Sequence, residues 1–375
     1  MTKNKKFVLI ASFPGSIQSF RGALIRAIQN KGYDVHVIVP NMPMSLQDSF
    51  KIKNISVHQV KLQRTGLNPF ADIIYFFKIY KILNKLGPDF VMGYTIKPVI
   101  YGSLAAWLAG VKNTFSLITG LGYAFTGEAK GKRKFIQKIL QFLYKIALNT
   151  NAGVFFQNND DKCLFQSLGL VTTKTPISVV NGSGINVEDF QPTAFPLSVD
   201  FLLIARLLGD KGIREYAKAA KMLKESHPTA TCRLVGFVDD NPDSIQESEL
   251  QSWVDGGYID FLGRMDDVKP AITQSAVYVL PSYREGTPRS VLEAMAMGRP
   301  IITTDAPGCR ETVVNGVNGF LIPVKDSIAI YNKMIQFIED KPLAETMGLK
   351  SREIAEQKFD VHKVNDFMLK EMRIK

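Results

Sequence analysis

Short apolar stretches alternate with longer helical patterns through the first half of the chain. The short stretches are rich in β-branched and aromatic residues, which is typical of strands buried on both faces of a parallel sheet. Helical patterns lie between them, for example over residues 18–29 and 70–86. This alternation predicts a parallel sheet covered by helices on both faces. Strands are expected at residues 7–11, 35–39, 90–93, 115–118, 154–157 and 177–180.

The same alternation restarts after residues 191–196, where two prolines interrupt regular structure. At 375 residues the chain is longer than one hydrophobic core usually supports. We therefore expect an α/β protein with two Rossmann-like domains, residues 1–192 and 198–358, facing across a cleft. Residues 359–375 are expected to form a helix that packs back on the first domain. Strands of the second domain are expected at residues 201–205, 232–236, 259–262, 277–281, 300–304 and 320–323.

Positive charge is concentrated in the first half of the chain. Residues 1–195 contain 23 lysines and arginines against 9 aspartates and glutamates, whereas residues 196–375 contain 23 against 26. No recognised nucleic-acid motif accompanies this excess, so we expect no nucleic-acid partner. An anionic membrane surface is the better candidate, because basic residues near such a surface each gain about 1 kcal/mol.

The cysteines and the hydropathy indicate the cellular setting. The three cysteines, Cys163, Cys232 and Cys309, are far apart, which fits a reducing compartment better than a disulfide framework. The uncharged stretch between Lys97 and Lys112 is too short to span a bilayer, and no other uncharged stretch of the sequence is long enough. We expect a cytoplasmic protein that is peripheral at the inner face of the cell membrane.

A candidate anion site lies between residues 281 and 298. A loop follows the strand expected at 277–281, and we expect Thr287 to cap the next helix and Pro288 to open it. The start of a helix presents backbone N–H groups and the positive end of a dipole, which suits a phosphate. Two glutamates, Glu285 and Glu293, flank this start. The N–H groups expected to face the anion are those of Ser290, Val291 and Leu292.

A basic pair, Arg206 and Lys211, follows the strand at 201–205 and could hold the same anion. Such a pair could neutralise a leaving diphosphate. Taken alone, either the glutamate spacing or the Arg–Lys pair is more typical of solvated surface charges. Together they indicate a nucleoside diphosphate ligand. No metal or cofactor is expected, because the chain has no D-x-D motif and its aspartate pairs are adjacent, at residues 160–161, 239–240 and 266–267.

Four motifs in this order resemble the retaining glycosyltransferases of family 4, which have the GT-B fold. They are residues 181–186, 205–212, 261–264 with Asp267, and 285–293. Many family members carry a histidine after a strand of the N-terminal domain, but residues 118–123 read Ile-Thr-Gly-Leu-Gly-Tyr here. This glycine version resembles a subgroup that extends polyprenyl-diphosphate-linked sugars, including N-acetylgalactosaminyltransferases acting on lipid-linked diacetylbacillosamine.

The resemblance implies roles for individual residues. Arg206 and Lys211 would hold the donor diphosphate, Glu293 the ribose hydroxyls, and Glu285 would lie beside the donor sugar. The segment around Arg264 would face the nucleotide base. Gly15 would let a loop of the first domain approach the diphosphate, where a side chain would obstruct closure.

The acceptor side is less sharply defined by the sequence. Arg21 and Lys97 lie near expected strand ends and could meet an acceptor diphosphate, although surface placement is an equal alternative. Residues 130–148 predict a basic amphipathic helix, which either lies at a bilayer interface or packs on its own domain. Residues 70–86 form a weaker membrane candidate, for which core packing is favoured.

The sequence therefore predicts a retaining, metal-independent hexosyltransferase with a UDP-sugar donor. The acceptor would be a lipid-linked or other glycan in the assembly of a bacterial surface polysaccharide or glycoprotein glycan. Two alternatives remain: a UDP-sugar 2-epimerase with the same architecture, and a non-catalytic nucleotide-sugar binding protein.

Overall fold

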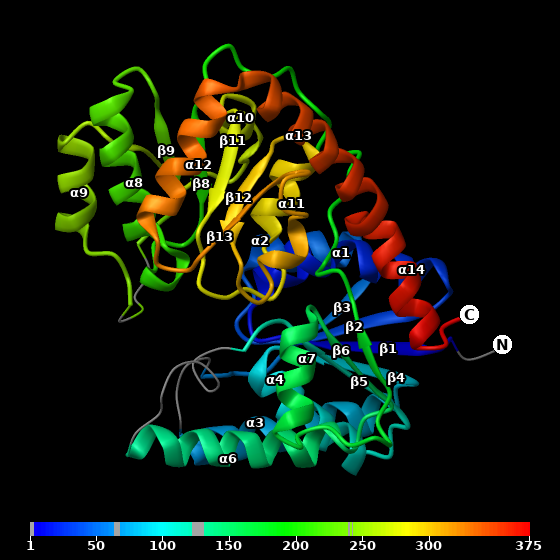
Figure 1. The fold of residues 1–375 in the computed structure, drawn as a ribbon. Helices are drawn as coiled ribbons and strands as arrows, with labels where there is room; N and C mark the ends of the chain where they lie inside the picture. The colour runs from blue at the N-terminus through cyan, green and yellow to red at the C-terminus, as the bar shows by residue number, and fades with distance from the viewer. Residues whose placement is uncertain (1–3, 64–67, 122–130, 239–240, 242) are drawn as a thin grey trace. The chain divides into compact units, whose positions relative to one another are not determined.

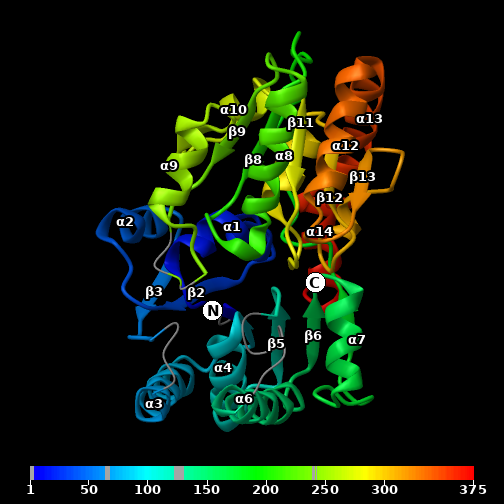
Figure 2. The same ribbon diagram turned by 60° about the vertical axis from the view of Figure 1, so that its left-hand side comes forward.

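The computed structural model describes the chain except for residues 1–3, 64–67, 122–130, 239–240 and 242. The chain divides into two compact units, one formed by Met1–Ser183 with His362–Lys375 and the other by Gly184–Val361. Each unit is a parallel β-sheet with helices on both faces (Figures 1 and 2). The sequence prediction of an α/β fold with two parallel sheets is confirmed.

The sheet of the first unit has the strand order β3-β2-β1-β4-β5-β6-β7, and all its pairings are parallel. Its topological switch point, where the strand order reverses, lies between β1 and β4. The strands are β1 (Lys6–Ile10), β2 (Asp34–Val39), β3 (Ile55–Gln59), β4 (Phe90–Tyr94), β5 (Asn113–Ile118), β6 (Gly153–Phe156) and β7 (Ile177–Val179).

Alternate side chains of β1 enter two separate cores, as the period of a strand requires. Phe7 and Leu9 pack on one face with α1, α2 and α14, whereas Val8 and Ile10 pack on the other with α3 and α4. Helices α6 and α7 continue this second layer. The helices are α1 (Pro14–Asn30), α2 (Met44–Ile52), α3 (Pro69–Leu86), α4 (Ile96–Leu108), α6 (Lys132–Leu148), α7 (Asn159–Ser167) and α14 (Val361–Glu371).

The sequence fixes both ends of α3. The Asn68 side chain accepts hydrogen bonds from the N–H groups of Phe70 and Ala71, and Pro69 occupies the first turn, where its missing N–H costs nothing. Gly87 ends the helix in the left-handed conformation. This helix is therefore well defined at both ends by local signals.

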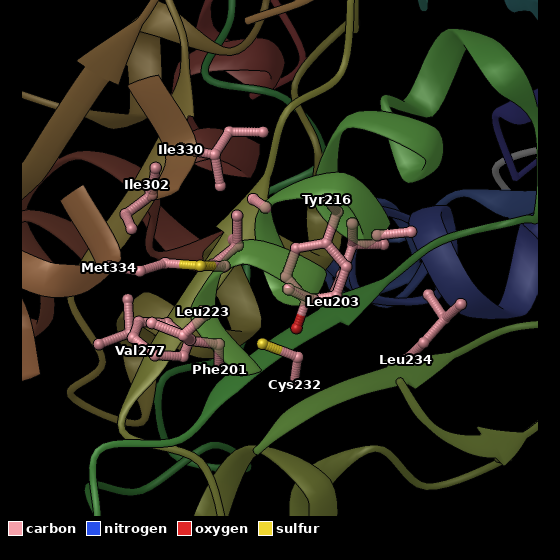
Figure 3. Close-up of a cluster of buried hydrophobic side chains, with 14 of the residues drawn as sticks. Phe201, Leu203, Tyr216, Leu223, Cys232, Leu234, Val277, Ile302, Ile330 and Met334 are labelled. Carbon is pink, nitrogen blue, oxygen red and sulfur yellow. The ribbon is translucent and has the colours of Figure 1, made fainter. Parts of the chain in front are cut away.

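The second unit contains a six-stranded parallel sheet of order β10-β9-β8-β11-β12-β13. Its core brings Phe201 and Leu203 of β8 against Tyr216 of α8 and Met334 of α12 (Figure 3). The strands are β8 (Phe201–Ile204), β9 (Cys232–Val235), β10 (Asp260–Gly263), β11 (Val277–Leu280), β12 (Ile301–Thr304) and β13 (Gly319–Ile322). The helices are α8 (Ile213–Ser226), α9 (Glu247–Asp255), α10 (Lys269–Thr273), α11 (Arg289–Ala296), α12 (Ser327–Glu339) and α13 (Lys341–Ile354). Short 3₁₀ turns at Gly209–Lys211 and Arg310–Thr312 and a π-helical turn at Ala355–Phe359 complete the unit.

Each strand expected from the sequence is present within a few residues, and β3 is an additional one. The expected boundary at residues 192–198 differs from the observed division at Ser183 and Gly184. Ile185 is buried in the second unit and exchanges backbone hydrogen bonds with Phe359 and Val361. At the other end of the chain, Met368 and Met372 pack in the core of the first unit with Leu9.

Arg299 ties the proline-containing segment to the second unit. Its guanidinium is 1% exposed and donates to the carbonyls of Thr193, Ala194 and Ile272, among others. It also donates to the Thr193 hydroxyl at 2.6 Å and lies over the Phe195 ring. Burial lowers the pKa of Arg299 to about 10. The segment that looked like a free linker is therefore anchored by one buried arginine.

We expect Arg299→Met to destabilise the second unit by about 3 kcal/mol, because several buried carbonyls lose their donor together. Urea denaturation followed by the fluorescence of buried Trp253, in a Trp107→Phe background, measures the change. The exposed Arg26→Met is the control and should leave the midpoint unchanged. Equal midpoints for the two variants would contradict the anchoring role.

Candidate active site

The switch point of the second sheet lies between β8 and β11. Open α/β sheets bind ligands outside the carboxyl ends of their strands at such a point. Tyr278 of β11 pairs with Leu202 of β8. The loops that follow these two strands therefore leave the sheet next to each other. Together with α11, which follows the second loop, they carry most of the residues selected from the sequence.

The two loops are joined at the carbonyl of Asp210. The N–H of Tyr283 donates to this oxygen at 2.9 Å, and the hydroxyl of Ser282 donates to it at 3.2 Å. Burial raises the pKa of the Asp210 carboxyl, and the neighbouring Lys211 charge opposes that rise. The turn at residues 209–211 is thereby held against the loop after β11.

Lys211 and Glu285 form an ion pair across these loops. The Lys211 Nζ atom donates to Glu285 Oε1 at 2.6 Å, and their side chains are only 15% and 17% exposed. Burial acts to lower the pKa of Lys211, but the charge and hydrogen bond of Glu285 outweigh it, so the pKa is raised. Two residues selected independently from the sequence are therefore in direct contact.

Arg206 lies two residues beyond the end of β8 and is exposed. The positive charge of Arg206 acts to lower the pKa of Lys211 and opposes the rise in the pKa of Asp210. The guanidinium is therefore within electrostatic range of both side chains. The site thus combines a half-buried ion pair with an exposed cation. Arg206 is therefore accessible to an anion in solution.

Helix α11 begins one residue later than expected. Pro288 is the N-cap residue and Arg289 the first helical one, whereas Thr287 was expected as the cap and Pro288 as the first helical residue. The N–H of Leu292 donates to the Pro288 carbonyl at 3.3 Å, so this amide is used within the helix. The geometry of a first turn leaves the N–H groups of Ser290 and Val291 with no intrahelical acceptor.

The start of α11 is anchored to the end of β8. The Ser290 hydroxyl donates to the Ile204 carbonyl at 3.2 Å, and the Tyr278 hydroxyl donates to the same oxygen at 3.0 Å. This carbonyl lies two residues before Arg206. The first turn of α11 is therefore fixed beside the loop that carries Arg206 and Lys211.

Glu293 lies one turn inside α11 and accepts a hydrogen bond from Arg289 Nε at 2.8 Å. Burial raises the pKa of the Glu293 carboxyl, whereas the charge and hydrogen bond of Arg289 oppose this. Burial also raises the pKa of Tyr278, and the charges of Glu293 and Glu285 add to that effect. Both glutamates are therefore within electrostatic range of Tyr278 in β11.

Arg264 follows β10 directly. Its side chain is 71% exposed, and its guanidinium lies over the Phe237 ring, 5.4 Å from the ring centre. Phe237 itself follows β9 and is exposed. The two residues form a flat, cationic and aromatic surface at the carboxyl ends of β9 and β10.

Gly15, Arg21 and Lys97 belong to the first unit. A Cβ at Gly15 would lie 2.8 Å from the Phe13 ring. Arg21 is buried on α1 with its guanidinium 5.4 Å from the centre of the Tyr94 ring. Burial raises the pKa of Tyr94 to about 12, although its hydrogen bond with Ser16 and the charge of Arg21 oppose this rise.

Lys97, at the start of α4, forms a 2.6 Å ion pair with Asp72 of α3. The Tyr101 hydroxyl donates to the other oxygen of Asp72 at 3.1 Å. This pair joins two helices, a role that the sequence did not indicate. Gly122 and Tyr123 of the expected glycine loop, Lys130 of the basic helix and the aspartates at 239–240 lie outside the described residues.

Comparisons with known proteins decide the family. Residues 10–158 match the model described as Glycosyl transferase 4-like, and residues 198–340 match Glycosyl transferases group 1. The N,N'-diacetylbacillosaminyl-diphospho-undecaprenol α-1,3-N-acetylgalactosaminyltransferase of Campylobacter jejuni is 32% identical over 346 residues, 88% of each chain. The chain belongs to the glycosyltransferase 4 family. The family expected from the sequence motifs is confirmed.

Two further relatives are informative about this glycosyltransferase. The UDP-Gal:α-D-GlcNAc-diphosphoundecaprenol α-1,3-galactosyltransferase of Escherichia coli is 27% identical over 297 residues, 72% of each chain. The crystal structure of Anabaena HepE with UDP and glucose superposes with a TM-score of 0.76 at 18% identity, covering 99% of this chain and 100% of HepE. The glycosyltransferase therefore has the GT-B fold, as expected.

Two glycines of the glycosyltransferase site have a steric role that the sequence motifs did not indicate. A Cβ at Gly308 (φ +80°) would lie 2.1 Å from the Glu285 carbonyl oxygen, and one at Gly212 (φ +70°) 2.1 Å from the Pro281 carbonyl oxygen. The Pro307-Gly308 turn was the available signal. Only glycine permits the loops to approach this closely.

We expect Gly308→Ala to destabilise the glycosyltransferase by about 2 kcal/mol more than Gly316→Ala. Gly316 has nearly the same φ, +79°, but no atom within 4 Å of its would-be Cβ, so it is a matched control for backbone strain. Differential scanning calorimetry should show a melting temperature about 4–8 °C lower for Gly308→Ala than for the control. Equal melting temperatures would remove the steric argument.

Proposed function

We propose that this glycosyltransferase moves a sugar from a UDP-linked donor to a polyprenyl-diphosphate-linked glycan, with retention of the anomeric configuration. The observation that carries the proposal is the half-buried Lys211–Glu285 pair beside exposed Arg206 at a topological switch point. The names of two relatives support the acceptor class, since both describe diphospho-undecaprenol substrates. The name of the Escherichia coli relative also supports a UDP-linked donor.

In this proposal the second unit stabilises the departing diphosphate. Breaking the bond between the anomeric carbon and the phosphate oxygen develops negative charge on the diphosphate. Arg206, Lys211 and the N–H groups of Ser290 and Val291 supply fixed positive charge and hydrogen bonds where this charge appears. A bound metal is not required for that task.

The remaining donor contacts follow from position. Glu293, one turn inside α11, would bind the ribose hydroxyls, and Glu285, held by Lys211, would orient the donor sugar. The nucleotide base would stack on Arg264, whose guanidinium already lies over Phe237.

Retention can proceed on one face of the sugar. The acceptor oxygen forms its bond to the anomeric carbon on the side from which the diphosphate leaves. A phosphate oxygen of the leaving diphosphate takes the proton of the acceptor hydroxyl. No enzyme nucleophile is needed, so Glu285 serves as an orienting group rather than as a covalent one.

We assign the acceptor to the first unit and the protein to the inner face of the cell membrane. Arg21 and Lys97 flank the switch point of the first sheet and would meet the acceptor diphosphate. No helix among the described residues has both the length and the apolar character needed to cross a bilayer. Peripheral association is therefore the form of membrane contact that we propose.

The central test is a screen of UDP-sugars with a bacterial membrane extract as the source of acceptor, followed by mass spectrometry of the lipid products. We expect UDP release that requires the extract, and a lipid product heavier by one sugar. Arg206→Ala should lower kcat by about 100- to 1,000-fold, because a preorganised charge on the leaving group is lost. Arg214→Ala is the control, since Arg214 pairs with Glu249 instead.

The same assay separates the alternatives. A UDP-sugar 2-epimerase would convert UDP-N-acetylglucosamine into its epimer without any acceptor. A binding protein would retain the donor without releasing UDP in any mixture. Either result would end the proposal of sugar transfer.

A second prediction concerns Lys97. We expect Lys97→Ala to raise the KM for the lipid-linked acceptor about tenfold with little change in the KM for the donor, because one charge-assisted contact is lost. Asp72→Asn breaks the same ion pair but keeps the cation, so it controls for structural damage. If both variants raise the acceptor KM equally, Lys97 acts only by joining α3 to α4.

A further inference from the structure

Helix α3 exposes a row of large apolar side chains. Phe70, Ile73, Ile74 and Phe77 recur three or four residues apart and are 50% to 78% exposed. The opposite side of the helix, with Tyr75, is buried in the core. The sequence favours core packing for this segment, and in the structure only one side of the helix packs in the core. Because apolar residues occur all around this helix, its sequence does not show which side faces the core.

Helix α6 exposes a second row of the same kind. Phe135, Ile139, Phe142 and Ile146 are 41% to 67% exposed, whereas Tyr144 is buried. One side of this helix therefore packs on its own domain, which is one of the two alternatives considered for it, and the other side is exposed. A soluble monomer seldom leaves two neighbouring rows of large apolar side chains in water without a binding role.

Both rows belong to one layer of the first unit. Helix α4 packs against α3 and against α6, and all three cover the same face of the sheet (Figures 1 and 2). Exposed lysines accompany the rows. They are Lys78, Lys81 and Lys85 on α3 and Lys134, Lys138 and Lys145 on α6.

We propose that the outer sides of α3 and α6 form one docking surface for an anionic lipid bilayer, with both helices lying in the interface. The apolar rows would enter the acyl boundary while the lysines meet anionic headgroups, the arrangement typical of interfacial helices. The positive charge of the lysines favours an anionic bilayer as the partner of this surface. A second copy of the chain would bring the same lysines against each other.

The surface adjoins the edge of the sheet where the acceptor is expected, an inference that rests on the proposed function. The first turn of α3 contacts the start of α4 through the Asp72–Lys97 pair, just beyond the end of β4. Tyr144 of α6 lines a cavity of about 170 Å³ together with Thr95 and Ile118. Thr95 directly follows β4, and Ile118 is the last residue of β5. A bilayer docked on both helices would thus present a lipid-linked diphosphate to that edge.

The test is co-sedimentation of the full chain with vesicles of phosphatidylcholine, with and without phosphatidylglycerol, in the absence of any nucleotide sugar. We expect binding to the anionic vesicles that weakens as salt is raised. The double variant Phe77→Ser with Phe142→Ser should bind them about tenfold more weakly. The matched control, Ile328→Ser with Leu349→Ser, changes two similarly exposed side chains of the second unit and should bind normally.

Lys138→Gln with Lys145→Gln should weaken binding to the anionic vesicles alone, because only these offer headgroup charge. Undiminished binding by the Phe77/Phe142 variant would overturn the proposal. So would a dimer in lipid-free solution, seen by light scattering, that this variant converts to a monomer. Because no sugar donor is present, vesicle binding can succeed while sugar transfer fails, which distinguishes an error in this surface from an error in the proposed function.

Discussion

The close approach of two loops is the constraint on which the candidate site depends. The loop after β8 approaches the loop after β11 because glycine occupies position 212, where a Cβ would lie 2.1 Å from the Pro281 carbonyl oxygen. Gly308 in the loop after β12 permits an equally close approach to Glu285 from the other side. Both positions also have a positive φ that other residues rarely adopt. This approach brings Lys211 within 2.6 Å of Glu285. The ion pair is thus a consequence of backbone geometry rather than its cause.

The Lys211–Glu285 pair is difficult to justify by stability alone. Removing two charges from water costs several kcal/mol per ion in a protein interior, and a well-packed apolar pair would often serve equally well. The turn that carries Lys211 is already held by hydrogen bonds to the Asp210 carbonyl. A charged pair beside exposed Arg206 makes better sense as a preorganised site, in which an anionic ligand would share the lysine with the glutamate.

The sequence predicted the sheets well because their strands are short, continuous apolar runs. It missed β3, Ile55–Gln59, where apolar and polar residues alternate at an exposed edge of the sheet. It placed the start of α11 one residue early, since Pro288 is equally compatible with the N-cap position. Motif order selected Lys211 and Glu285, but the steric role of Gly308 arises from a contact 23 positions away in the chain. Periodicity also could not decide which side of α3 faces the core.

The two units carry opposite chemical characters, and this division explains the uneven charge of the chain. In the second unit Arg206 and Lys211 follow β8 at the switch point, and residues 196–375 contain slightly more acidic than basic residues. The first unit instead spreads lysines along α3 and α6, beside apolar side chains that water solvates poorly. A small anionic ligand needs a few precisely held charges, whereas a fluid anionic surface needs many loosely held ones. The basic residues of the two units therefore suit different kinds of anionic partner.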